Sequence, residues 1–311
     1  MAILDNRKVG FIGLGVMGYG MAQNLARKLP PSTSLIIFDI NQDAVESLAT
    51  EFRGLVAKGT SSRDVFATCD IVITMLPEGK HVKTVYTSKE SGLSSMNLKD
   101  NIFIDCSTID VETCLAVKEF FADIGGSASF YDAPVSGGVT GANEGKLAFF
   151  IGGSETDPGF STVEQVLRLM GTPEKIVPCG KTSAGLVAKL CHNYLAGVIN
   201  VAAAETMNLG IRAGIDPKVL YRVLVAGAAR NRLVEQDNPV PGLAPTSPSS
   251  KGYRPGFRAS LMHKDVTLAV AMAEAADARL VLGQQALDTY TQALPEYGDM
   301  DFTVVYRLFA E

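Results

Sequence analysis

The sequence lacks the features of several protein classes. It has no basic tract, and its net charge of −5 argues against nucleic acid or an anionic membrane surface as a partner. No apolar run reaches the roughly 18–20 residues that are needed to span a bilayer. The 311 residues are 47% hydrophobic and 20% charged, which is ordinary for a globular protein long enough to form two domains.

Cysteine and histidine are both scarce. The five cysteines are odd in number and have no CxxC spacing, which indicates reduced thiols. His81, His192 and His263 lie far apart in the sequence, so we expect neither a metal site nor a Ser-His-Asp triad. An apolar run begins within a few residues of Met1, so we expect no leader peptide in the sequence as given. We therefore expect a cytoplasmic protein, or a mitochondrial one if a targeting segment has been removed.

Short apolar runs and helical stretches alternate through the first half of the chain. This pattern predicts an α/β fold with a doubly wound parallel sheet that helices cover on both faces. We expect strands at 8–13, 35–39, 70–76, 101–105, 129–135, 147–153 and 175–180, and helices at 18–29, 41–52 and 154–171.

Strand-like runs disappear after about Lys181. Amphipathic helices are expected at 181–212, 216–226, 259–280 and 281–293. The segment 238–257 is too rich in Pro, Gly and Ser for a helix, and a loop of that length usually has a function or covers a site. We therefore predict two domains, the sheet domain at 1–179 and an all-α domain at 180–311.

A glycine-rich turn follows the first expected strand and precedes the first helix. Its pattern is Gly13-x-Gly15-x-x-Gly18. In a dinucleotide site the first glycine permits the tight turn, the second lets a pyrophosphate approach, and the third packs helix on strand. A plain glycine-rich turn is the alternative. The cofactor contacts expected here are Gly13, Leu14, Gly15, Val16, Met17 and Gly18.

Asp39 ends the second expected strand, about 20 residues beyond the glycine turn, where a carboxylate binds a ribose 2′-hydroxyl and repels a 2′-phosphate. It favours NAD over NADP. Asp39 could instead cap the following helix, and Arg53 or Lys58 could compensate a phosphate, so NADP stays open.

Six motifs occur in one order along nearly the whole chain: FIGLGVMGYGMAQNL, DIVITMLP, FIDCSTID, DAPVSGGVTGANEGKLAFFIGG, GLVAKLCHN and LMHKDVTLA. Together they resemble the β-hydroxyacid dehydrogenase family. Segments 204–220 and 238–257 are most similar to members that oxidise 3-hydroxyisobutyrate. The resemblance implies a Rossmann-type domain joined by a long helix to an all-α domain that also forms the subunit interface. It also implies a cofactor across the sheet edge and a substrate between the domains.

The resemblance extends the list of site residues. Further cofactor contacts are implied for Met75, Leu76, Pro77, His81, Thr108, Phe257 and Lys264. An N-cap role for Ser107 or Thr108 and a solvated charge pair for Lys264 and Asp265 are alternatives. The resemblance assigns the substrate carboxylate to Ser136, Gly137 and Gly138. Two glycines after a serine can turn backbone N–H groups inward, although they can also form a plain flexible turn.

Lys189 lies in the apolar stretch GLVAKLCHN. Gly185, Lys189 and Asn193 are spaced i, i+4 and i+8, which places them near one face of a helix. We expect Gly185 to give that face a bare backbone, Lys189 an amine and Asn193 an amide. A lysine desolvated in a cleft has a lowered pKa and can accept a hydroxyl proton while hydride leaves the same carbon. The resemblance makes Lys189 the general acid/base and Asn193 the group that holds the substrate hydroxyl. A surface lysine snorkelling from an apolar helix is the alternative.

The implied activity is the oxidation of a small 3-hydroxy acid, 3-hydroxyisobutyrate first among them, to its semialdehyde with NAD. This reaction belongs to valine catabolism. The alternatives are an NADPH-dependent reductase of small semialdehydes or glyoxylate, and a non-catalytic nucleotide-binding scaffold. We expect a homodimer or homotetramer with a small-molecule substrate and no nucleic-acid or membrane partner.

Overall fold

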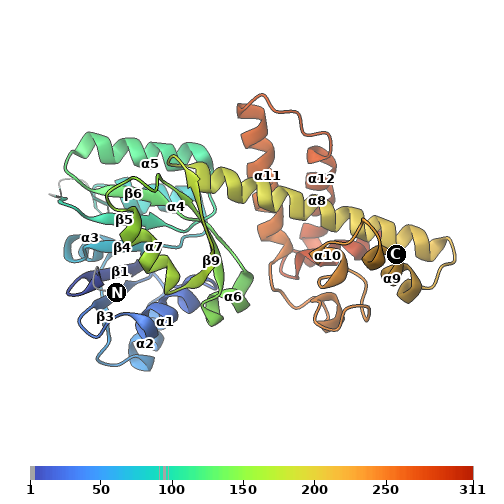
Figure 1. The fold of residues 1–311 in the computed structure, drawn as a ribbon, viewed down its shortest axis with the longest axis horizontal. Helices are drawn as coiled ribbons and strands as arrows, with labels where there is room; N and C mark the ends of the chain where they lie inside the picture. The colour runs from blue at the N-terminus through green and yellow to red at the C-terminus, as the bar shows by residue number, and fades with distance from the viewer. Residues whose placement is uncertain (1–3, 91, 94–95, 97, 311) are drawn as a thin grey trace. The chain divides into compact units, whose positions relative to one another are not determined.

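The computed structural model describes residues 4–90, 92–93, 96 and 98–310 (Figure 1). The chain divides into two compact units, Met1–Lys189 and Leu190–Glu311. The division falls inside one long helix, nine residues beyond Gly180, where the last strand ends. Each unit is described by itself.

The first unit is built on one sheet. Its strands are β1 (Lys8–Ile12), β2 (Ser34–Phe38), β3 (Val56–Lys58), β4 (Ile71–Thr74), β5 (Ile102–Asp105), β6 (Ser129–Asp132), β7 (Val135–Ser136), β8 (Leu147–Gly152) and β9 (Gly171–Gly180). They lie in the order β3-β2-β1-β4-β5-β6-β8-β7, and β9 pairs with β8. The first six strands are parallel. This 3-2-1-4-5-6 order is that of a Rossmann dinucleotide-binding domain, so the expected fold is confirmed.

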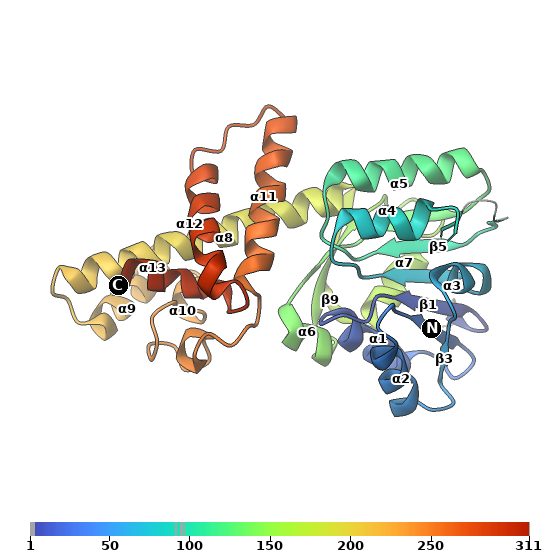
Figure 2. The same ribbon diagram turned by 180° about the vertical axis from the view of Figure 1, so that it is seen from behind.

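Helices cover both faces of this sheet (Figure 2). They are α1 (Gly18–Lys28), α2 (Gln42–Glu51), α3 (Ser62–Thr68), α4 (Gly79–Thr87), α5 (Val111–Ile124), α6 (Gly138–Glu144) and α7 (Phe160–Arg168). One hydrophobic core packs α1, α2 and α7 on the sheet, and the other packs α3, α4 and α5 on it. Neighbouring residues of one strand divide between these cores, as Phe103 and Ile104 of β5 do, because successive side chains point to opposite faces.

Several expected elements differ from those observed. The expected helix 154–171 begins only at Phe160, because Ser154 and Asp157 form a side-chain-bonded turn that Pro158 follows. The expected strand 129–135 is split into β6 and β7, and β9 begins four residues before the expected 175. The short β3 was not expected. β8 is antiparallel to β6 and β7, so the sheet is mainly but not entirely parallel.

The second unit is helical. It contains the greater part of α8 (Ala184–Arg212), together with α9 (Pro217–Ala226), α10 (Arg232–Glu235), η2 (Ser249–Lys251), α11 (Ala259–Ala275), α12 (Gly283–Tyr297), η3 (Phe302–Tyr306) and α13 (Arg307–Ala310). Its core forms where α8, α11 and α12 meet around the fully buried Tyr290. The Tyr290 hydroxyl donates to the Gly197 carbonyl and accepts from Asn200, both on α8. Burial of α8 therefore requires two matched polar groups as well as apolar packing.

By length and composition, α8 is the one helix of the described residues that could cross a membrane. A core helix meets the same criteria, and 44% of its apolar window is buried within the structure.

The segment 238–257 contains no regular structure apart from η2, and buried hydrogen bonds hold it in place. The carbonyl of the fully buried Asn238 accepts bonds from the hydroxyls of Ser247 (2.8 Å) and Ser249 (2.6 Å). At its end, one carboxylate oxygen of Asp301 accepts the N–H groups of Gly256 and Phe257, each at 3.0 Å. Hydrogen bonds within the segment and to Asp301, rather than a β-ladder, thus hold the loop in place.

We expect Asp301→Ala to lower the free energy of unfolding by about 3 kcal/mol, because it removes the acceptor of the N–H groups of Gly256, Phe257 and the buried Thr303. Guanidinium unfolding measures the loss. Asp299→Ala is the matched control, since the Asp299 side chain is 93% exposed and pairs only with Arg258 in the described residues. It should change the free energy by less than about 0.5 kcal/mol. Equal losses in the two variants would contradict this account of the loop.

Candidate active site

The glycine turn after β1 shows the backbone geometry that a dinucleotide needs. Gly13 has a φ of 100°, and a Cβ there would collide with the Met75 carbonyl oxygen. A Cβ at Gly18 would collide with the Gly13 carbonyl oxygen, so α1 packs directly on the turn. A Cβ at Gly15 would meet nothing within 4 Å. The open backbone at Gly15 fits a pyrophosphate at the α1 N-terminus, where free N–H groups and the helix dipole favour an anion.

The side chains of this turn differ in exposure. Leu14 is buried in the core, whereas Val16 is 63% exposed and Met17 is half-buried. The buried Leu14 anchors the turn and leaves the backbone around Val16 accessible.

Asp39 lies against the glycine turn. Its Oδ2 accepts the Leu14 N–H at 2.5 Å, and its Oδ1 accepts the Asn41 N–H at 2.6 Å. The N-cap of α2 is Asn41, whose side chain accepts from Asp43 and Ala44. The alternative that Asp39 caps this helix is therefore wrong. The Asp39 carboxylate stands at the end of β2 beside the turn, as a ribose-binding carboxylate does.

The segment after β4 carries Met75, Leu76, Pro77 and, in the first turn of α4, His81. The Leu76 N–H donates to the Ser107 hydroxyl oxygen at 2.8 Å. Met75 and Leu76 are half-buried, as is His81, and Pro77 is exposed. The bond to Ser107 ties the backbone of this segment to the segment that follows β5.

Ser107 is a structural residue that the sequence prediction missed. Its hydroxyl donates to Asp105 Oδ1 at 2.6 Å, and the Thr74 hydroxyl donates to the same oxygen at 2.6 Å. Burial raises the pKa of the Asp105 carboxyl to about 6.

The N-cap of α5 is Asp110, so the alternative cap role for Ser107 or Thr108 is wrong. The sequence signal that could have identified Ser107 is a hydroxyl residue two positions after a buried strand. The half-buried Thr108 follows Ser107 at the same sheet edge.

Ser136 ends β7, and Gly137 and Gly138 turn the chain into α6. Both glycines have positive φ, at 142° and 62°. Side-chain-bearing residues rarely adopt these angles, so the Gly-Gly pair is required by the turn itself. Ser136 is half-buried and Gly137 is exposed.

Lys189 and Asn193 lie one helical turn apart on α8, and both are buried, at 5% and 4% exposure. This burial does not match a solvated lysine that snorkels from an apolar helix. Gly185, one turn earlier, packs against the Phe150 carbonyl and the Asp132 carboxylate. It therefore contacts the sheet and does not offer a bare backbone surface.

The Asn193 amide is fixed by two neighbours in the helical unit. Its Nδ2 donates to Asp265 Oδ2 at 2.5 Å, and its Oδ1 lies 2.8 Å from His192 Nδ1. Asp265 Oδ1 forms an ion pair with Lys264 Nζ at 3.2 Å, although no hydrogen bond of good geometry reaches that oxygen from the described residues. Asp265 is 2% exposed. Asn193 and Lys264 are thus brought together through Asp265, which was not among the predicted site residues.

Phe257 precedes α11 in the same unit. Its N–H is bound by Asp301, and its ring packs edge-on against Phe302 at 6.1 Å between ring centroids. The ring is half-buried. Phe257 and Lys264 are held at the loop end and on the helix that follows it.

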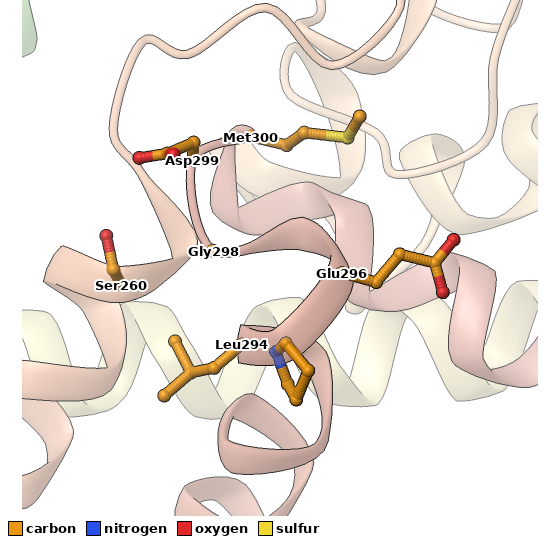
Figure 3. A pocket seen from close by; sticks show the side chains of 7 residues that line it. Ser260, Leu294, Glu296, Gly298, Asp299 and Met300 are labelled. Atoms are coloured by element: carbon orange, nitrogen blue, oxygen red, sulfur yellow. The ribbon is translucent and has the colours of Figure 1, made fainter.

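A separate pocket of about 310 Å³ lies where α12 ends beside the start of α11 (Figure 3). Its lining residues are Ser260, Leu294, Pro295, Glu296, Gly298, Asp299 and Met300. None is a predicted site residue. In the part of the chain that the structure describes, no group of three His, Cys, Asp or Glu residues could hold a metal ion.

Comparison with known proteins agrees with this geometry. Residues 8–182 match the family described as the NAD binding domain of 6-phosphogluconate dehydrogenase. Residues 183–309 match the family described as NAD-binding of NADP-dependent 3-hydroxyisobutyrate dehydrogenase. A 3-hydroxyisobutyrate dehydrogenase of Pseudomonas aeruginosa is 38% identical over 308 residues, covering 97% of this chain and 98% of that protein. This chain belongs to the β-hydroxyacid dehydrogenase family.

Other members of the β-hydroxyacid dehydrogenase family align over the same length. The mitochondrial 3-hydroxyisobutyrate dehydrogenase of Drosophila melanogaster is 37% identical over 97% of this chain and 89% of that protein. The structure of a Mycobacterium tuberculosis 3-hydroxyisobutyrate dehydrogenase with L-serine is 34% identical with a TM-score of 0.89, covering 98% of this chain and 99% of that one. The chain is therefore an NAD(P)-dependent hydroxyacid dehydrogenase.

Two single-methyl substitutions separate cofactor binding from folding in this family member. We expect Gly15→Ala to keep the stability of the wild type but to weaken NAD(P) binding by roughly tenfold, because the added Cβ enters open space over the turn. Gly13→Ala should also lower the free energy of unfolding, by about 2 kcal/mol, through its positive φ and its collision with Met75. Dinucleotide titration and thermal unfolding measure the two effects. Wild-type affinity in Gly15→Ala would contradict the assigned pyrophosphate position.

Proposed function

We propose that the protein oxidises 3-hydroxyisobutyrate, or a closely related small 3-hydroxy acid, to its semialdehyde with NAD, and that Lys189 is the general acid/base. The relatives in Pseudomonas and Drosophila carry this activity in their names. The Mycobacterium relative is recorded with L-serine, which is itself a small 3-hydroxy acid.

The observation that carries the proposal is the burial of Lys189 and Asn193 one turn apart on α8. Burying an amine costs free energy that a merely structural position in an apolar helix would avoid. Asn193, on the following turn of α8, adds an amide whose orientation is fixed by its hydrogen bond to Asp265. These features support a site that positions an alcohol rather than one that only packs.

Each group has a distinct part in the proposed reaction. Bound NAD would supply the hydride acceptor. Lys189 as the neutral amine would take the hydroxyl proton during oxidation, and as the ammonium it would return the proton during reduction. Asn193 would hold the hydroxyl oxygen against Lys189. The Ser136–Gly138 turn would bind the carboxylate and so select an acid over a simple alcohol.

The NAD preference rests on Asp39. Its carboxylate stands beside the glycine turn, and backbone N–H groups that bind both of its oxygens hold it in place. A 2′-phosphate there would meet like charge. The second lone pair of either oxygen could still accept a ribose hydroxyl.

We further propose a homo-oligomer located in the cytoplasm or the mitochondrion. Several large apolar side chains of α8 and α9 are exposed, among them Leu195, Leu209 and Val223. This exposure supports a homodimer or homotetramer formed through the helical unit, which sedimentation in solution would test. The relatives include bacterial and mitochondrial proteins, which supports either a cytoplasmic or a mitochondrial location.

A substrate panel with both cofactors tests the proposed reaction. We expect the highest kcat/KM with 3-hydroxyisobutyrate and NAD among 3-hydroxyisobutyrate, 3-hydroxypropionate, serine and glycerate.

Asp39→Asn should raise the NADP-to-NAD ratio of kcat/KM by roughly tenfold, because it removes one negative charge beside the 2′ position. Asp43→Asn, on the exposed first turn of α2, is the control. A wild-type preference for NADPH with glyoxylate or succinic semialdehyde would replace this proposal with the reductase.

The role of Lys189 has its own test. We expect Lys189→Ala to lower kcat by roughly 10²- to 10⁴-fold while NAD still binds, because general acid/base catalysis is lost and the glycine turn is untouched. Lys181→Ala, at an exposed position just before α8, should leave kcat unchanged. Turnover and NAD titration measure both. Unchanged turnover in Lys189→Ala would remove Lys189 from the mechanism, and NAD binding without turnover of any substrate in the wild type would indicate the scaffold.

A further inference from the structure

A buried carboxylate holds the start of the helix that carries Lys189. Asp132 is the last residue of β6 and is 1% exposed. Its Oδ1 accepts the Ser183 N–H at 2.7 Å, and its Oδ2 accepts the Leu186 N–H at 2.9 Å. These two N–H groups belong to the residue just before α8 and to its first turn. One side chain therefore binds the helix start to the end of a sheet strand.

Two glycines allow this close approach. A Cβ at Gly152 of β8 would collide with the Asp132 carboxylate. A Cβ at Gly185 would lie 2.8 Å from Asp132 Oδ2 and would collide with the Phe150 carbonyl oxygen. The α8 backbone thus rests directly on the carboxylate and on β8, with no side chain between them.

The electrostatics favour the same arrangement. Burial raises the pKa of the Asp132 carboxyl, and the N–H groups of Ser183 and Leu186 oppose that rise because they bind the charged form. The positive end of the helix dipole also favours an anion at this point. Asp105 is the register neighbour of Asp132, but its partners are the hydroxyls of Thr74 and Ser107. Of this pair, Asp132 is the one whose hydrogen bonds, among the described residues, reach the start of α8.

Because a helix is stiff, its first turn fixes the direction of the next. Lys189 follows Gly185 by four residues and Leu186 by three, so it lies on the next turn over the same face. A change in the rotation or rise of the helix start would move the amine by a comparable amount.

We propose that Asp132 is a positioning residue for Lys189, which fixes the rotation and axial position of α8 through the N–H groups of Ser183 and Leu186. This inference rests on the proposed role of Lys189 as acid/base. Asp132 itself touches neither substrate nor cofactor in this proposal.

The direct test is Asp132→Asn, which keeps the side-chain size but turns an NH₂ group toward one of the two N–H donors. We expect the single-turnover rate of NADH formation from 3-hydroxyisobutyrate to fall roughly 10- to 100-fold, as for a catalytic group displaced by about 1 Å. The dissociation constant for NAD should change less than about twofold, because the glycine turn is not involved. A wild-type rate would overturn the proposal, and so would a loss confined to NAD binding.

A matched control separates positioning from helix capping in general. Asp216 caps α9 by accepting from the N–H groups of Lys218 and Val219, at 2.9 and 3.2 Å. Asp216→Asn makes the same chemical change at another helix start and should keep the wild-type rate. An equal fall in the single-turnover rate in both variants would contradict a positioning role of Asp132 that is specific to Lys189.

A double-mutant cycle tests whether the effect passes through Lys189. In the Lys189→Ala background, adding Asp132→Asn should cost no further residual turnover, whereas the losses in thermal stability should add. An equal fold-loss with and without Lys189 would overturn the proposal. If Asp132→Asn does not fold, Gly185→Ala disturbs the same junction from the helix side and should give the same rate-specific loss. Wild-type turnover in Lys189→Ala would instead refute the proposed function, which distinguishes the two failures.

Discussion

The alignment of five parallel strands in one register is the constraint on which the site in the first unit depends. Phe38 pairs with Ile12, Ile12 with Thr74, Thr74 with Asp105, and Asp105 with Asp132. Each is the last residue of its strand. The chain therefore leaves the sheet along one straight edge, and whatever residue comes next in each segment is placed on that edge. The register alone places Gly13, Asp39 and Met75 there, and Ser107 one residue further along, before any side-chain contact is made.

Carboxylates along this edge, the half-buried Asp39 and the buried Asp105 and Asp132, then hold the neighbouring segments in place. Asp39 binds the glycine turn, Asp105 binds Ser107 and through it the Leu76 backbone, and Asp132 binds the start of α8. Each carboxylate uses its charge to hold N–H or O–H groups of a neighbouring segment, which offsets the cost of its own desolvation. Carboxylates act in the same way in the helical unit, where Asp265 accepts a hydrogen bond from the Asn193 amide and Asp301 accepts one from the Phe257 N–H. The segments that carry the proposed chemistry are loops or helix starts, and carboxylates make them rigid.

The sequence predicts the sheet well, because a strand buried on both faces must be apolar at successive positions, as in Ile71–Thr74. It does not predict β3, which has three residues of which only Val56 is buried, nor the antiparallel direction of β8, because an apolar run carries no information on strand direction. The glycine turn is predicted because its backbone requirement is local. Ser107, Asp132 and Asp265 lie within the motifs named above, but their bonding partners are not predicted, because each bond joins residues 31 to 72 positions apart in the sequence.

The lysine in GLVAKLCHN shows how local and distant constraints combine. Periodicity places Gly185 and Lys189 on one face of α8, but it suggests that the glycine keeps that face open. The structure gives the glycine a different reason: it lets the helix backbone meet Asp132 and β8. Gly185, which the sequence suggests as part of a binding surface, therefore packs against the sheet instead. The apolar neighbours Leu186 and Leu190 bury the helix, and once they do, the direction of Lys189 is set by whatever fixes the first turn. The two hydrogen bonds from the helix start to a single buried carboxylate hold the backbone from which the Lys189 side chain extends, so they limit the region that its amine can reach.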